Sequence, residues 1–289
     1  VTVWRRLGQP SPTITITRSF ARDLEGPLDQ DILPASRVVD VSCGDMIVRI
    51  PETREDARVV DLVESWPFRF GELGLRISTG PVVTFRTREF LLSKADRGPS
   101  APLLSVHNVQ PFRTVWPVEK KGKALAFRIC AESMRHLLPV KNYVLLRRFS
   151  AKEETRRLTA SCFLHCDAWR TYVALENHLN YIYHASRELT VDETYGIAAF
   201  FNCALVDHYF RTISGNTQVN ASEVRTMKLP GMEPIVRIGS HVRKLRELSP
   251  QAVEKIVLEE LRIDGELAAY LAGAKAPGWG DNFRNGPCP

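Results

Sequence analysis

The sequence has no long apolar run and few cysteines. No stretch approaches the roughly 18 apolar residues that a membrane-spanning helix requires, and residues 1–6 contain no apolar stretch of the kind found in signal peptides. The six cysteines are too few and too scattered along 289 residues for a disulfide framework, which predicts free thiols in a reducing compartment. These absences predict a cytoplasmic protein without a membrane partner.

Recognisable catalytic and metal-binding motifs are also missing. The sequence contains no Gly-x-Ser-x-Gly, no Walker loop and no His-Glu-x-x-His. The run 38–45 includes a glycine, as nucleotide-binding loops do, but it has only one and continues as a predicted strand, which favours an ordinary turn. Cys162, His165 and Cys166 could supply three zinc ligands, yet no second Cys/His pair at a matching spacing follows, which favours a core role. We therefore expect neither a catalytic residue nor a metal site.

The chain does have a globular composition with a basic balance. Hydrophobic residues make up 44% and charged residues 25%, and the formal net charge is +6. This charge permits a polyanionic partner without requiring one. The length suits one large domain or two ordinary ones, and the first residue is valine rather than methionine, which suggests a piece of a longer protein.

Strand and helix patterns are mixed along the chain, which predicts an α+β fold. Alternating runs predict strands at 11–17, 37–41, 46–50, 75–78, 82–86, 142–149 and 157–164, with a helix as the alternative for the last. Apolar residues at helical spacing predict helices at 55–64, 190–213 and from 249 towards 271. We expect a β-rich segment at 1–92, a core at 93–232, and a helical appendage with a loose tail at 233–289.

Three polar clusters stand out. Segment 141–157 carries six cations and two acids, a net charge of +4, and forms either a turn that straddles phosphates or a solvated basic surface. Segment 176–184 contains two Asn, two His and two Tyr, which either contact bases or form the polar face of an edge strand. Segment 213–220 is rich in amides and hydroxyls, and is either a hydrogen-bonded turn or a contact loop.

Taken together, these segments resemble the C-terminal half of PstI/BsuBI-type DNA adenine-N6 methyltransferases of bacterial restriction-modification systems. The resemblance spans roughly residues 1–230, in the family's order, and is carried by 75–86, 102–109, 143–154, 176–182, 201–211 and 214–220. In that family an N-terminal Rossmann-like domain binds S-adenosylmethionine and carries an Asn-Pro-Pro-Tyr motif, which this sequence lacks. The resemblance thus implies a target-recognition half, with a mixed α+β fold similar to the C-terminal domain of the TaqI methyltransferase, that is inactive alone.

The resemblance and the charge pattern together suggest roles for particular residues. DNA-backbone contacts are expected from Arg76, Ser78, Thr79, Gly80, Arg147, Arg148, Lys152, Arg156 and Arg157. Base contacts, or bracing of the loops, are expected from Asn177, His178, Asn180, Tyr181, Asn216, Thr217, Gln218 and Asn220.

The expected partners are double-stranded DNA and the catalytic domain of the same protein. No cofactor is expected in this chain, since S-adenosylmethionine would bind the catalytic domain. The alternatives are a basic scaffolding or protein-docking module, a partner in RNA modification, and an independent enzyme whose site the sequence does not reveal.

Overall fold

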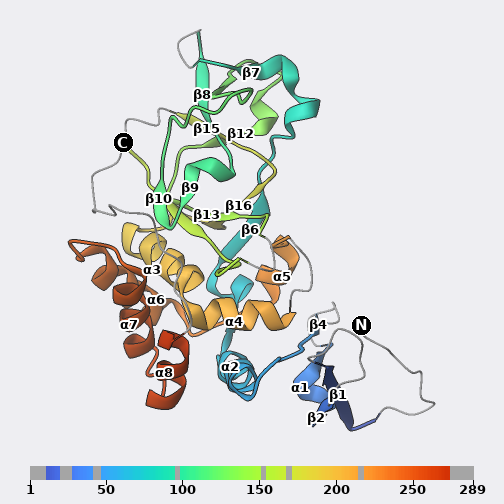
Figure 1. The fold of residues 1–289 in the computed structure, drawn as a ribbon. Coiled ribbons are helices and arrows are strands. Elements are labelled where there is room, and N and C mark those ends of the chain that lie inside the picture. The colour runs from blue at the N-terminus through green and yellow to red at the C-terminus, as the bar shows by residue number, and fades with distance from the viewer. Residues whose placement is uncertain are drawn as a thin grey trace.

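The fold consists of two larger sheets and a layer of helices (Figure 1). It is taken from a computed structural model, which describes residues 11–19, 28–41, 47–94, 98–150, 154–166, 171–213 and 218–273. The mixture of sheets and helices confirms the expected α+β class. Within these ranges, no helix has the length and apolarity needed to cross a membrane.

The six-stranded sheet lies at the centre of the molecule. Its strands, in spatial order, are β6 (Leu75–Thr79), β16 (Leu179–His184), β13 (Tyr143–Arg147), β14 (Ala160–Phe163), β10 (Phe112–Thr114) and β9 (Val109–Gln110). Neighbours are antiparallel except for the parallel pair β10–β14. The antiparallel pairing of β13 with β14 confirms the predicted strand at 157–164 over the helical alternative.

The five-stranded sheet packs against one face of the six-stranded sheet. Its strands, in spatial order, are β12 (Leu137–Pro139), β15 (Tyr172–Leu175), β8 (Ser100–Leu104), β11 (Ala126–Arg128) and β7 (Leu91–Leu92). Leu145 and Phe163 of one sheet share a buried cluster with Leu104, Val173 and Leu175 of the other. Alternate residues of each strand therefore line the space between the sheets.

Helices cover the other face of the six-stranded sheet. The layer contains α2 (Arg54–Ser65), α3 (Val191–Asn202), α4 (Ala204–Ile213), α5 (Ala221–Thr226), α6 (Met232–Arg243), α7 (Pro250–Glu260) and α8 (Gly265–Gly273). Val144 and Leu146 of β13 join the same buried cluster as Phe200 of α3, Ile235 of α6 and Val253 of α7. Packing thus crosses the boundary expected near residue 232, and the β6–β16 pair crosses the one expected near residue 92.

The predicted helix at 190–213 is divided at Cys203. Its start is as expected, because the Thr190 hydroxyl accepts from the Glu193 amide and the Glu193 carboxylate accepts from the Thr190 amide. Cys203 is extended, with φ −85° and ψ 156°, and α4 begins after it. The cause is tertiary, since Glu254 Oε2 on α7 accepts from the Ala204 amide at 2.7 Å and so caps the second helix.

Helices α3 and α6 approach each other closely at two glycines, one on each helix. A β-carbon on Gly196 would lie 1.9 Å from the carbonyl oxygen of Ile235, and one on Gly239 would lie 1.8 Å from that of Asp192. Both distances are far below van der Waals contact. Neither position can therefore carry a side chain unless the helices separate.

The remaining elements lie outside the two larger sheets and the helical layer. The strands are β1 (Thr13–Ser19), β2 (Leu28–Pro34), β3 (Val39–Asp40), β4 (Ile47–Val48), β5 (Phe68–Arg69) and β17 (Lys228–Leu229), and α1 spans Ala35–Val38. The 3₁₀ turns are η1 (Phe70–Leu73), η2 (Thr84–Arg86), η3 (Arg88–Phe90), η4 (Val106–Asn108) and η5 (Met134–His136).

Three predicted strands in this part of the chain need correction. Residues 82–86 do not form a strand, because Val82 bridges to Glu176 and the next residues turn into η2. The predicted strand at 37–41 is shortened to β3, since α1 takes the residues before it, and the one at 46–50 is shortened to β4.

The cysteines differ from the expectation in one respect. Cys130, Cys162 and Cys203 are free, as predicted, whereas Cys166 takes part in a disulfide bond. Cys162 is buried, its thiol faces the Thr194 carbonyl oxygen at 3.8 Å, and burial raises its pKa. Cys162 and Cys166 therefore do not act as a pair of zinc ligands, and no cluster of three or more potential metal ligands occurs in the described ranges.

Candidate nucleic-acid interface

Four segments that lie far apart in the sequence meet at one end of the six-stranded sheet. Strands β6 and β13 end there at Thr79 and Arg147, and the antiparallel β16 begins there at Leu179. The segment before α5 joins them, because Gln218 forms a β-bridge with Phe149. We call residues 78–80, 147–149, 177–180 and 218–220 the strand-end cluster.

Asn180 is the internal brace of the strand-end cluster. Its side chain is fully buried, its Oδ1 accepts from the Thr79 hydroxyl at 2.9 Å, and its Nδ2 donates to the Val219 carbonyl at 2.7 Å. These bonds join the end of β6, the start of β16 and the loop before α5. Of the two roles expected for Asn180, the structure supports bracing rather than base contact.

Arg147 and Arg148 also hold loops together. Arg147 donates from Nε and Nη2 to the Val109 carbonyl at 2.9 and 2.6 Å, and burial lowers its pKa. Arg148 donates from Nη1 to the Asn177 carbonyl at 3.2 Å and from Nη2 to Gln218 Oε1 at 3.1 Å. Both guanidinium groups are half-buried. Their charges reach solvent only in part, and each guanidinium uses two of its five N–H donors for bracing.

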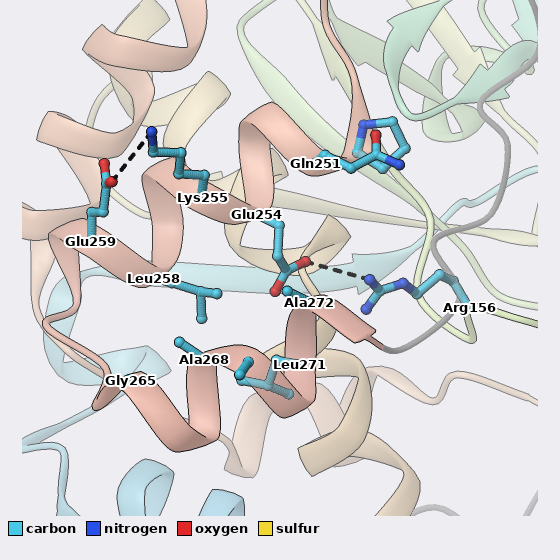
Figure 2. Close-up of a pocket in the computed structure, with 12 residues that line it drawn as sticks. Arg156, Gln251, Glu254, Lys255, Leu258, Glu259, Gly265, Ala268, Leu271 and Ala272 are labelled. Carbon is cyan, nitrogen blue, oxygen red and sulfur yellow. Dashed lines mark hydrogen bonds and ion pairs between the residues drawn. The ribbon is translucent and has the colours of Figure 1, made fainter.

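Arg156 and Arg157 point into the protein. Figure 2 shows Arg156 facing Glu254 beside a cavity of about 420 Å³ between α7 and α8; the two groups lie 3.4 Å apart and both side chains are 9% exposed. Burial raises the pKa of Glu254. Arg157 is 2% exposed and its guanidinium lies over the Phe210 ring, 5.8 Å from the centroid. Neither side chain can meet a phosphate in this conformation, which corrects the expected backbone contacts at both positions.

Gly80 is required by packing. A β-carbon at this position would lie 2.3 Å from the Glu176 carbonyl oxygen and 2.6 Å from that of Leu175. The Gly80 amide donates to the Leu179 carbonyl at 2.8 Å. The turn after β6 is thereby pressed against the junction of β15 with β16.

Seven further residues were expected at the site, of which the structure describes four. Arg76 is exposed and its Nη1 donates to the Leu75 carbonyl, while the half-buried Ser78 lies opposite Tyr181 in the β6–β16 register. Tyr181 stacks on Tyr183 with ring centroids 5.4 Å apart, and burial raises its pKa. Asn220 precedes α5, and its backbone amide donates to Glu223 Oε2 at 3.2 Å. Lys152, Asn216 and Thr217 lie outside the described residues.

Two aromatic side chains of the strand-end cluster face solvent. The Phe149 side chain is 43% exposed, and the His178 ring packs edge-on against it with centroids 4.9 Å apart. The His178 side chain is 42% exposed, and its Nδ1 lies 3.5 Å from Glu176 Oε1. Exposed rings beside buried amides are suited to stacking on, or hydrogen bonding with, a flat ligand.

Cations that the sequence did not single out lie close to this cluster. Arg88, Lys120 and Lys123 are exposed, and we call them the basic rim. Arg88 and Lys123 line a cavity together with Glu176. Burial, followed by the charges of Lys120 and Lys123, lowers the pKa of the exposed His107. The basic rim thus supplies exposed cations near the cluster, whereas the Arg156 and Arg157 side chains lie largely within the protein.

The chain is similar in sequence to part of two known proteins. No protein-family model matches the chain. The chain is 31% identical over 231 residues to the Type II methyltransferase M.PstI of Providencia stuartii, a match that covers 80% of this chain and 45% of that protein. It is 32% identical over 235 residues to the Type II methyltransferase M.BsuBI of Bacillus subtilis, covering 80% and 46%. The chain is a homologue of part of these Type II methyltransferases.

The methyltransferase homology confirms the resemblance seen in the sequence. The chain spans about half the length of the curated relatives it matches. Among solved structures, the type IIG restriction endonuclease BpuSI aligns with a TM-score of 0.42 at 10% identity, covering 78% of this chain and 34% of that chain. Similarity at that level is too loose to assign function to residues.

The residues that sequence reasoning missed in this methyltransferase homologue are Arg88, Lys120, Lys123, Phe85 and Glu176. The lysines belong to a Lys-rich turn that reads as ordinary solvated surface, and Arg88 comes two residues after Arg86, just past a segment predicted as a strand. A signal did exist for Glu176, because it begins the Asn- and His-rich segment. Its neighbourhood depends on the contact between β15, β8 and the bridge at Val82, which the sequence does not reveal.

Proposed function

We propose that this chain binds double-stranded DNA sequence-specifically, as the target-recognition part of an adenine-N6 methyltransferase. In this proposal the catalytic domain that uses S-adenosylmethionine lies outside the chain. The observation that supports it is the strand-end cluster, which gathers four segments around exposed Phe149 and His178 beside the basic rim. Homology to Type II methyltransferases makes DNA the polyanion to test first.

The proposed division of labour follows from the chemistry of base methylation. An enzyme that modifies a base within a duplex must take that base out of the stack, so a second surface has to hold the duplex and recognise the site. Exposed cations supply affinity for phosphates, whereas groups that reach base edges supply discrimination. We assign the first role to the basic rim and the second to His178 and Asn177, with Phe149 as a stacking surface.

Replacing two rim cations is expected to weaken binding to every duplex alike. In an Arg88→Ala/Lys123→Ala variant, two fewer phosphates are neutralised, so the slope of log K against log salt becomes shallower by about two units. Electrophoretic mobility shifts or fluorescence anisotropy at several salt concentrations measure this slope. The matched control is Lys244→Ala/Lys255→Ala, which removes two exposed cations from the helical layer. An unchanged slope in the rim variant, or equal changes in both variants, would contradict the assignment.

Replacing His178 is expected to affect discrimination instead. His178→Ala removes an exposed imidazole without touching the buried braces, so affinity for the preferred site should fall by about 1–3 kcal/mol while affinity for unrelated duplexes is unchanged. The preferred site is first obtained by repeated selection from a random duplex library. Equal losses for selected and unrelated duplexes would remove His178 from the reading surface, and equal binding of duplex RNA would contradict a DNA-specific role.

A further inference from the structure

A cavity of about 230 Å³ opens beside the strand-end cluster, against η2, β7 and β8 of the five-stranded sheet. Its lining includes Thr84, Phe85, Arg88, Ser105, Lys123 and Glu176. The volume corresponds to roughly seven or eight water molecules at about 30 Å³ each. This is the scale of one flat ring system and is below the range typical of drug-sized ligands.

Glu176 is held at this cavity by main-chain bonds on both sides. Its amide donates to the Leu104 carbonyl at 2.9 Å, its carbonyl accepts from the Leu179 amide at 2.9 Å, and it forms a parallel bridge with Val82. Only 6% of its side chain is exposed. The carboxylate therefore has a fixed position at the junction of β15 with β16.

The Glu176 carboxylate has few partners within the protein. The His178 ring lies beside it, with Nδ1 3.5 Å from Oε1, and no residue in the described part of the chain donates a hydrogen bond to it. A buried carboxylate is costly unless donors satisfy its oxygens. Acceptor capacity thus remains open for a ligand with N–H groups.

The exposed groups around the cavity complement this acceptor. The Phe85 side chain is 64% exposed, and the Arg86 guanidinium lies 5.3 Å from its ring centroid. Arg88 and Lys123 are exposed cations in the same lining. An inner hydrogen-bond acceptor, an aromatic wall and outer cations match the base, the ring face and the phosphate of a nucleotide.

We propose that this cavity binds an unpaired guanine base, with the Glu176 carboxylate accepting from it. Guanine presents its N1–H and N2 amino groups side by side, which matches the two oxygens of a carboxylate. Cytosine and adenine place an acceptor nitrogen next to their amino group, and thymine flanks its single N–H with two carbonyl oxygens that repel a carboxylate. The inference rests on the proposed DNA binding and adds a second way of reading the strand, through a base that has left the stack.

Bulged duplexes test this inference without knowledge of the target sequence. Four duplexes of one sequence, each with a single unpaired dG, dC, dA or dT at the same position, are titrated by fluorescence anisotropy against the perfectly paired duplex. The wild-type chain is expected to bind the dG bulge about tenfold more tightly than the dT bulge, with dC and dA between them. Glu176→Gln should remove the preference for dG, because an amide offers one acceptor where the carboxylate offers two.

Two controls make the result interpretable. Glu89→Gln neutralises an exposed carboxylate on η3 outside the cavity lining, and it should retain the dG preference in full. Thermal unfolding of both variants reports that the fold is intact. Equal binding of all four bulges by the wild-type chain, or a dG preference that survives in Glu176→Gln, overturns the guanine assignment. Failure of the wild-type chain to bind any duplex, paired or bulged, overturns the proposed function instead.

Discussion

Asp207→Ala is expected to lower the free energy of unfolding by about 3–5 kcal/mol, the largest effect of any single substitution considered. Asp207 is 2% exposed, and its Oδ1 accepts from the backbone amides of Arg157 and Leu158 at 2.6 and 3.0 Å. Its Oδ2 accepts from Arg211 Nε at 2.8 Å, and Arg211 in turn donates to the Glu154 carbonyl. Alanine leaves two backbone donors and a guanidinium without their acceptor, and unsatisfied buried donors are costly.

Urea unfolding followed by tryptophan fluorescence measures this loss. Asp207→Asn retains one carbonyl oxygen for the two amides, so its loss should be smaller than that of alanine. The control is Glu259→Ala, which breaks an exposed ion pair with Lys255 and should change stability by no more than about 0.5 kcal/mol. A decrease below about 1 kcal/mol in Asp207→Ala would show that these bonds do not hold the 154–158 segment to α4.

Gly239→Ala is expected to destabilise the protein by about 3 kcal/mol, although alanine is the better helix former. The added methyl group would lie 1.8 Å from the Asp192 carbonyl oxygen, and the nearby amide of Gly196 would be only 2.7 Å away. Both neighbours are backbone atoms of α3, which cannot rotate aside as a side chain can. Relief requires α3 and α6 to separate, and this loosens the cluster that contains Ile235 and Phe200.

Gly265→Ala is the matched control, because a β-carbon there meets no atom within 4 Å. Loss of glycine flexibility in the unfolded chain should make this variant neutral or slightly more stable, by up to about 1 kcal/mol. Thermal and urea unfolding of both variants provide the comparison. If Gly239→Ala were as stable as Gly265→Ala, the close crossing of α3 and α6 would be disproved.

Local patterns predicted the elements whose causes are themselves local. Alternation in 142–149 and 157–164 corresponds to the β13–β14 hairpin, and the Thr190 capping box marks the start of α3. Ser249 caps α7 as its sequence indicated, since its hydroxyl accepts from the Ala252 amide at 3.2 Å. These features depend on residues within a few positions of each other, so sequence spacing describes them well.

Features with distant causes were not predictable in the same way. The break at Cys203 depends on Glu254 from α7, 50 residues beyond the Ala204 amide that it caps. Arg156 is buried for the same reason, because Glu254 is also its ion-pair partner. A run of cations shows net charge but not the direction of each side chain, and so the basic segment looked more exposed than it is.

The candidate site also combines features that the sequence predicts with features that depend on distant contacts. Residue types identified the polar segments, and strand order brought them together. Burial distinguishes the two residues, since Asn180 is fully buried and braces the loops whereas the His178 side chain reaches the surface, where base contact is our proposal. The Glu176 cavity is lined by segments that lie far apart in the sequence, among them η2, β8 and residues 122–124, and no spacing in the sequence encodes it.

Two of the braces of the strand-end cluster bond to main-chain oxygens as well as to side chains. Asn180 donates to the Val219 carbonyl and Arg148 to the Asn177 carbonyl, and every residue type supplies such an acceptor. These hydrogen bonds therefore do not depend on which side chains occupy exposed positions such as Phe149 and His178. Substitutions there can accumulate, in nature or in a directed-evolution library, without a penalty in folding, and so new binding preferences can be selected on an unchanged scaffold.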